Sequence, residues 1–223
     1  YAKYSLKAKQ VLFTTSNVPQ YAWSIPSNIW EDYDVLEYIE GDGNSWIDTG
    51  IPVKELDEYG FTLSFEKTDQ TKATEILLGN TFEDSMKQLV LINNNIRIDW
   101  VGTATLLSIA LGRHSVEVKE GKLYLDDVFK ANVSASAVGT LSTVLFGKRN
   151  TASGVEQNTL SKSRIYRFKC HNREFFPVKK KSTGEVMMID ILTGQEYTNQ
   201  GTGTFTASTN IIERPVFRQV LFF

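Results

Sequence analysis

The chain has 223 residues, of which 41% are hydrophobic, 12% aromatic and 22% charged. This composition is ordinary for a globular protein, so disorder is not the default interpretation, and the length suits one large β-domain with extensions or two small domains. A formal net charge of −2 disfavours a general nucleic-acid binder, which usually carries a basic excess. No stretch is long and apolar enough to insert into a membrane.

Residues 1–34 differ from the rest of the chain. They carry two prolines, turn-prone polar stretches and scattered aromatic residues, and they lack helical periodicity. This pattern predicts an extended N-terminal arm with one strand near residues 9–14. Because the arm is too short to bury its own aromatic residues, it either packs across the main domain or docks on a neighbour. Trp23 and Trp30 are therefore candidate assembly residues.

From Val35 onward the sequence has the alternation and turn residues of an all-β domain. In segment 59–68 three apolar residues alternate with three polar ones, Phe61, Leu63 and Phe65 against Thr62, Ser64 and Glu66. Further strands are predicted at 36–40, 45–51, 73–82, 88–92, 96–100, 140–148, 161–170, 174–181, 185–191, 195–198 and 204–206. Segment 104–111 is the one helix candidate, and it is equally compatible with a strand.

The hairpin at residues 114–129 is the clearest local signal. Its apolar residues, Val116 and Val118 and then Leu123 and Leu125, alternate with polar ones around a Glu120-Gly121 turn. So many short strands joined by Gly, Asn and Asp turns imply two packed antiparallel sheets or a jelly roll. The basic run 179–181 is interpreted as a solvated loop, or as charges that keep an edge strand from pairing with another chain.

Residues 208–223 are predicted to form a C-terminal strand or assembly tail. The last stretch is apolar, β-prone and nearly uncharged, which is hazardous if it is left exposed. It either completes the same sheet or is donated as a strand to another subunit. The candidate assembly residues in this tail are Phe217, Val220, Leu221, Phe222 and Phe223.

Three stretches together resemble concanavalin A-like (laminin-G-like) domains, which are abundant in phage structural proteins and in surface proteins of gut bacteria. They are residues 36–50, with Leu-Glu-Tyr-Ile-Glu and Trp-Ile-Asp-Thr-Gly, the hairpin 112–126, and the closing signature at 164–205. The resemblance covers residues 35–207 and implies a two-sheet antiparallel jelly-roll sandwich. Within the closing signature, Met187-Met188-Ile189 replaces a segment that usually contains glycine. The resemblance brings neither a catalytic group nor a ligand.

The search for catalysis argues against an enzyme. Glycoside hydrolases need two carboxylates across one sugar, and the laminarinase-like group carries them as Glu-x-Asp-x-x-Glu on one strand. Here Met188 stands where the first Glu belongs, so the motif fails. Cys170 is the single cysteine, and His171 beside it points to the opposite face of a strand, so Cys170 is interpreted as a small buried side chain.

No cofactor is predicted. The two histidines have no zinc-site spacing. Calcium is the one metal left open, through Asp42 and Asn44 or through Asp126 and Asp127. A turn-forming Asp is nevertheless commoner than a calcium ligand, so we favour turns at these positions.

A glycan site would combine an exposed aromatic platform with amide or carboxylate partners. Trp100 is the best platform candidate, with Asp99 beside it and Asn94 in the preceding turn. A structural role for Trp100 is favoured over a sugar platform, and Trp46 is expected to pack in the core.

Two functions from different classes remain. The first is a non-catalytic phage virion structural protein, a fibre, tail or capsid-decoration subunit that forms a homo-oligomer or binds other virion proteins and contacts host-surface polysaccharide. The alternative is a carbohydrate-binding module of a bacterial surface protein. The location is accordingly the virion or the bacterial cell surface.

Overall fold

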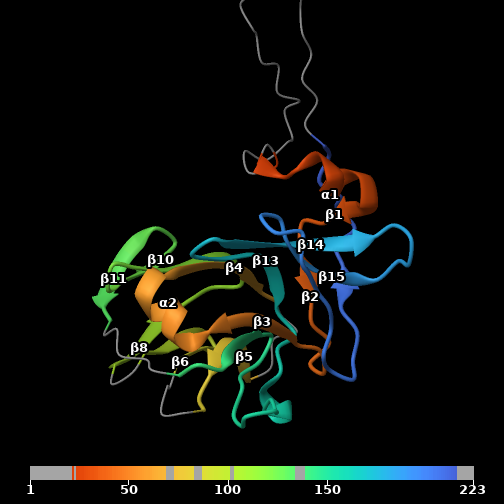
Figure 1. Ribbon diagram of the computed structural model, residues 1–223. Coiled ribbons are helices and arrows are strands. Elements are labelled where there is room, and N and C mark those ends of the chain that lie inside the picture. The colour runs from red at the N-terminus through yellow and green to blue at the C-terminus, as the bar shows by residue number, and fades with distance from the viewer. Residues whose placement is uncertain are drawn as a thin grey trace, which may run out of the picture.

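The computed structural model describes residues 22, 24–68, 73–82, 87–100, 103–133 and 139–214. Two antiparallel sheets pack face to face as a sandwich, with α2 (Val53–Tyr59) at one end and α1 (Ser27–Asp32) above the larger sheet (Figure 1). The structure therefore confirms the predicted all-β, two-sheet architecture.

The larger sheet follows the order β11-β10-β9-β4-β13-β14-β15-β16, with β1 paired to β14 and β2 paired to β13 and β17. Its strands are β1 (Tyr33–Val35), β2 (Ile39–Glu40), β4 (Phe61–Lys67), β9 (Gly112–Lys119), β10 (Lys122–Leu125), β11 (Val128–Asn132), β13 (Arg164–Cys170), β14 (Arg173–Lys180), β15 (Val186–Asp190), β16 (Glu196–Tyr197) and β17 (Thr206–Ala207).

The smaller sheet has six strands in the order β3-β12-β5-β6-β7-β8. They are β3 (Ile47–Pro52), β5 (Thr74–Asn80), β6 (Lys87–Ile92), β7 (Asn95–Trp100), β8 (Thr103–Ser108) and β12 (Ser142–Leu145), and a short 3-10 helix, η2 (Gln157–Thr159), follows β12. Segment 104–111, the helix candidate, is thus mostly edge strand β8, which is the alternative that its sequence left open.

The main core lies between the two sheets, as strand alternation predicts. Phe61, Leu63 and Phe65 of β4 are buried there, while the intervening residues of the same strand face outward. The apolar residues of the predicted hairpin are buried in the same core: Val116, Val118, Leu123 and Leu125. The structure confirms both patterns.

A second apolar cluster lies on the outer side of the larger sheet. Strands β14 and β15 present apolar side chains on both faces, and α1 with its flanking residues covers the outer one (Figure 1). The cluster consists of Ala22, Ile25, Ile29, Trp30, Tyr33, Val35, Phe176, Val178, Met187, Ile189, Ile191 and Ile212. The described part of the N-terminal arm therefore packs on its own domain.

Sequence periodicity missed both α-helices because they are short and depend on tertiary contacts. Helix α1 has six residues and α2 has seven, and neither has a side-chain N-cap hydrogen bond. Helix α2 ends at Gly60, whose φ of 74° favours glycine. Asp57 fixes α2 to the smaller sheet, because its carboxylate lies 2.7 Å from Lys87 Nζ.

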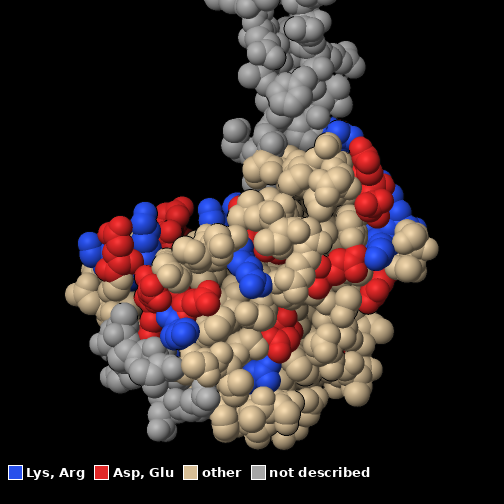
Figure 2. All heavy atoms as spheres, in the orientation of Figure 1, with Lys and Arg blue, Asp and Glu red and all other residues tan. Residues whose placement is uncertain are grey.

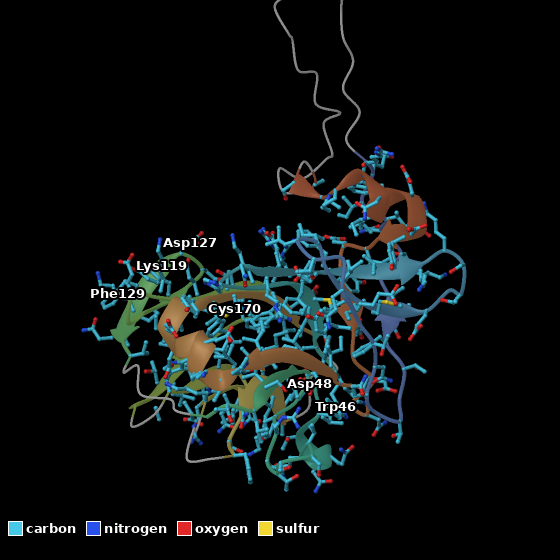
Figure 3. All side chains as sticks on the ribbon, viewed as in Figure 1. Trp46, Asp48, Lys119, Asp127, Phe129 and Cys170 are labelled. Carbon is cyan, nitrogen blue, oxygen red and sulfur yellow. The ribbon has the colours of Figure 1, made fainter. Side chains whose placement is uncertain are left out.

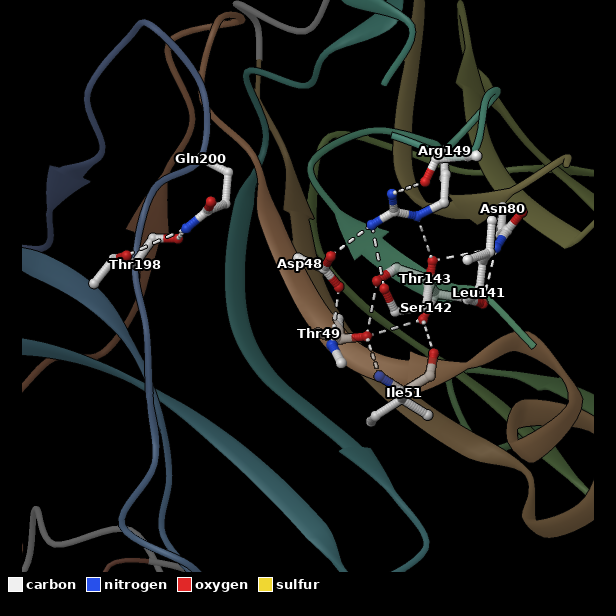
Figure 4. A network of polar contacts seen from close by, with 12 residues as sticks. Asp48, Thr49, Ile51, Asn80, Leu141, Ser142, Thr143, Arg149, Thr198 and Gln200 are labelled. Carbon is white, nitrogen blue, oxygen red and sulfur yellow. Dashed lines mark hydrogen bonds and ion pairs between the residues drawn. The ribbon is translucent and has the colours of Figure 1, made fainter. Parts of the chain in front are cut away.

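A polar network fastens three strands of the smaller sheet (Figure 4). The buried Arg149 guanidinium donates to Asp48 Oδ2 at 2.5 Å and to the Ser142 carbonyl at 2.9 Å. The Asn80 side chain donates to the carbonyl of Leu141 at 3.0 Å, and Thr49 donates to that of Thr143 at 2.8 Å. Because these groups bond one another, we interpret the network as structural.

Candidate functional site

Among the described residues, no element covers the outer face of the larger sheet over β9, β4 and β13, between the β10–β11 hairpin and α1 (Figure 1). Antiparallel register sets side chains from the three strands in rows across this face. Thr62 lies between Glu117 and Lys169, Ser64 lies between Ser115 and Arg167, and Glu66 lies between Arg113 and Arg164.

These rows enclose a pocket of about 340 Å³. Its lining combines hydroxyl groups, three cationic side chains and one aromatic ring: Thr62, Ser64, Ser115, Arg113, Arg167, Lys169 and Tyr166. A second, shallower pocket of about 290 Å³ shares Thr62 and Lys169 with the first and extends to Tyr59 and His171. We call the two together the outer groove.

A bulge in β13 places two consecutive residues at the groove. The pairing of β13 with β4 shifts between Ile165 and Arg167, so Tyr166 and Arg167 both line the pocket. The Tyr166 hydroxyl donates to Glu66, and burial together with that hydrogen bond raises the pKa of Tyr166 above its usual range. Tyr166 therefore forms a fixed wall of the pocket, and its hydroxyl group stays un-ionised.

Ion pairs hold part of the groove wall in place. Arg164 donates to Glu40 at 2.7 Å and to Glu66 at 3.2 Å, and hydrogen bonding by these carboxylates raises the arginine's pKa. Arg167 forms an ion pair with Glu174. The orientation of both guanidinium groups is therefore set by the protein itself.

The far end of the groove carries an exposed aromatic pair. The ring centroids of Tyr59 and His171 lie 3.8 Å apart, and Tyr59 is 45% exposed. Gly60 follows Tyr59 and passes so close to β9 that a Cβ there would lie 2.1 Å from the Val118 carbonyl oxygen. This close approach holds the end of α2 against the sheet beside the groove.

The predicted glycan-binding residues do not form a site. Trp100 is only 1% exposed, its Nε1 donates to Asp57 at 2.6 Å, and Lys87 Nζ lies 4.5 Å from its ring centre. Trp100 therefore has the structural role that we favoured, and a platform at this position is excluded by its burial. Burial also lowers the pKa of Lys87.

The two partners proposed for Trp100 are engaged elsewhere. Asp99 is buried and accepts hydrogen bonds from Gln88 at 2.6 Å and Arg97 at 2.7 Å. Asn94 is exposed, but it lies in the turn at the opposite end of β7 and accepts from Lys67 at 3.0 Å.

The assembly candidates divide between described and undescribed residues. Trp30 is buried in the second cluster, and its Nε1 donates to the Ile25 carbonyl at 3.2 Å, so this residue is part of the domain itself. The other candidates lie outside the described residues: Trp23, Phe217, Val220, Leu221, Phe222 and Phe223. Trp46, expected in the core, is only partly buried at its edge.

Two of the acidic turn residues proposed as calcium ligands, Asp42 and Asp126, take part in protein hydrogen bonds. Asp42 accepts from Ser45, from the Asn44 amide and from the Thr204 amide, which fits a turn. Asp126 lies 2.9 Å from His114 Nδ1 and accepts from the Ser115 amide at the same distance. Across the described ranges, no group of three or more His, Cys, Asp or Glu side chains is arranged to hold a metal ion.

Cys170 is buried in the main core (Figure 3). Burial raises the pKa of its thiol to about 12. The thiol is therefore protonated at neutral pH, as expected for a structural residue rather than a nucleophile.

Sequence reasoning missed the outer groove, although part of its signal was visible. The polar positions 62, 64 and 66 stood out as the outward half of an alternating strand, and Arg167 and Lys169 alternate in segment 161–170. The pairing of these strands with each other and with β9 had no signal in the sequence.

Comparisons with known proteins concern the fold. No protein-family model and no curated protein matches the chain. Among solved structures, the CBM40 domain of Ruminococcus gnavus IT-sialidase matches with a TM-score of 0.46 and 17% identity, covering 60% of this chain and 89% of that one. A candidate carbohydrate-binding protein from Bacteroides ovatus ATCC 8483 matches with a TM-score of 0.50 and 10% identity, covering 81% of this chain and 62% of that one. At this identity the second likeness shows a shared fold.

Proposed function

We propose that the chain is a non-catalytic carbohydrate-binding domain that holds a glycan in the outer groove. The observation that carries this proposal is the groove itself, a polar surface of hydroxyl groups and charged side chains, mostly cationic in the main pocket and including Glu117 in the second, that ends at an exposed aromatic pair. Hydroxyl and cationic groups can hydrogen-bond sugar hydroxyls, and an aromatic ring offers a flat apolar surface to the C–H face of a sugar. The fold shared with the Bacteroides ovatus protein supports the same proposal.

A bacterial surface or extracellular location follows from this proposal, since surface polysaccharides are found there. In the part of the chain that the structure covers, no helix combines the length and the hydrophobicity of a membrane span.

Titration of the full chain with a panel of oligosaccharides by calorimetry tests the proposal. We expect saturable binding to at least one glycan, and Tyr59→Ala to lower its affinity by about tenfold, because the exposed ring is lost from the groove. Leu106→Ala is the matched control, since Leu106 is a 60% exposed apolar residue on the other sheet. Absence of binding across the panel, or an equal loss in both variants, would contradict the proposal.

A virion structural role is the second proposal, favoured by exposed apolar residues on the β10–β11 hairpin. Val128 is 55% exposed and Phe129 is 50% exposed, and β11 is the last strand of the larger sheet, where another subunit can pair (Figure 3). Mass spectrometry of purified phage particles tests this role. A fixed ratio to the major capsid protein supports it, and absence from particles contradicts it.

A further inference from the structure

The arginines around the outer groove differ in what neutralises them. Arg164 is paired with Glu40 and Glu66, and Arg167 is paired with Glu174. Arg113, on the other side of the groove, has neutral contacts: its Nε donates to Ser64 Oγ at 3.3 Å, and its guanidinium carbon lies 3.9 Å from the centre of the Tyr166 ring. These contacts orient the guanidinium without cancelling its charge.

The carboxylate nearest to Arg113 in the strand register is committed elsewhere. Glu66 is the cross-strand partner of Arg113, but its carboxylate accepts from Arg164 and from the Tyr166 hydroxyl. Over the described ranges, no ion pair includes Arg113 or Lys169. Both side chains are exposed.

The main pocket of the groove is therefore a positive site on a protein of net charge −2. Its lining contains three cations and no carboxylate, and one of the three, Arg167, is already paired. Glu117, in the row of Lys169, lines the second pocket instead. Arg113 is paired with Glu66 and Lys169 with Thr62, so their rows are four residues apart along β4. At the usual rise per strand residue, the two rows are separated by about 13 Å. Their positions suit anionic groups spread along an extended ligand better than a single small anion.

We propose that the main pocket of the outer groove is specific for acidic glycans, polysaccharides that carry carboxylate or sulfate groups, and that Arg113 is the residue that binds the anion. This inference rests on the proposed carbohydrate-binding function and names the class of its ligand. The planar guanidinium donates two parallel hydrogen bonds to a carboxylate or a sulfate, and the Tyr166 ring beneath it keeps it in that orientation. The hydroxyl groups of Thr62, Ser64 and Ser115 then face the sugar hydroxyls.

Calorimetry of the full chain with matched ligand pairs tests the proposal. Oligogalacturonate is compared with its fully methyl-esterified form, and dextran sulfate with dextran, so that each pair differs in the anionic group. We expect the acidic member of at least one pair to bind more than tenfold tighter than its neutral partner. The responding pair identifies the anion as carboxylate or sulfate. Raising the salt from about 50 to about 500 mM is expected to weaken that binding.

Two variants assign the anion contact. Arg113→Gln is expected to abolish the preference for the acidic ligand, and Arg113→Lys to restore it in part, because lysine keeps the charge but loses the planar fork. Arg97→Gln is the matched control, since Arg97 is a part-exposed arginine on the smaller sheet. An equal loss in Arg97→Gln would mean non-specific attraction and would overturn the proposal.

The outcomes separate this inference from the proposed function. Binding of neutral and acidic members with equal affinity, unchanged in Arg113→Gln, would overturn the acidic specificity and leave carbohydrate binding intact. Failure to bind any member of the pairs, together with no binding in the wider oligosaccharide panel, would overturn both.

Discussion

The outer face of the larger sheet has two halves of opposite character. Over β14 and β15 its outward residues are apolar, and the segment around α1 buries them. Over β4 and β9 the outward residues are hydroxyl-bearing or charged, and the surface stays open as a groove. The same outer face thus forms a second core over β14 and β15 and a candidate binding site over β4 and β9. Whether the outward side chains are apolar or polar therefore decides whether that part of the sheet must be covered by another segment.

Charged side chains of both signs gather over the β10–β11 hairpin and along the edge of the molecule near α1 (Figure 2). At the junction of the two halves stands Arg167, which lines the groove and whose guanidinium carbon lies 5.3 Å from the centre of the Phe176 ring. Phe176 belongs to the covered half. The edge of the second core therefore supports one wall of the groove.

In the covered half, the largest effect on stability is expected at Phe176, which is 2% exposed. Phe176→Ala is expected to lower the free energy of unfolding by about 3–5 kcal/mol, because it leaves a cavity beneath α1. Urea unfolding followed by fluorescence measures the loss. Phe129→Ala is the control on an exposed phenylalanine, where about 0.5 kcal/mol or less is expected. Similar losses in the two variants would refute the second core.

A weaker link between α1 and the sheet is Lys181, whose Nζ donates to the carbonyl oxygens of Trp30 at 2.7 Å and Glu31 at 3.2 Å. These carbonyls lie at the end of α1, where a cation is favourable. Lys181→Met is expected to cost about 0.3–1 kcal/mol of stability. Hydrogen exchange of the α1 amides should speed up in this variant while that of β4 does not. Unchanged exchange in α1 would argue against the link.

The covered half also predicts a dependence of stability on pH. Hydrogen bonds from Lys180 and Tyr33 to the Glu196 carboxylate lower its pKa. The folded state then binds fewer protons than the unfolded state in the acid range, so stability rises with pH there. The contribution is complete above the unfolded pKa of about 4.3 and is lost as pH falls through the lower folded pKa.

Glu196→Gln is expected to flatten that part of the stability profile, as measured by urea midpoints between about pH 2 and pH 6. Glu185→Gln is a suitable comparison, since Glu185 is exposed in the neighbouring turn. A profile in Glu196→Gln that matches the unmodified chain would show that this carboxylate contributes nothing to folding.

The smallest effect on folding is expected in the open half. Ser64 lies on the groove floor and accepts a hydrogen bond from Arg113 Nε. Ser64→Ala should change the free energy of unfolding by less than about 0.5 kcal/mol, because no buried apolar contact is lost. The same variant should lower the affinity for an acidic glycan several-fold. A large loss of stability would show that the open half is structural.

The sequence by itself determined the main architecture, because alternation along single strands is a local property. Phe61, Leu63 and Phe65 could be assigned to the core from their spacing alone, and so could the apolar residues of the hairpin around Gly121. Cys170 could be placed inside for the same reason.

Tertiary structure alone decided the rest. The outer groove exists because β4, β9 and β13 pair, which brings Ser64, Arg113 and Tyr166 together from distant segments. The sequence favoured a structural role for Trp100 but could not name its partners, Asp57 of α2 and Lys87 of β6, which only the fold brings to it. A polar or amphipathic side chain is buried or exposed according to the partners that the fold brings to it, and those partners lie elsewhere in the chain.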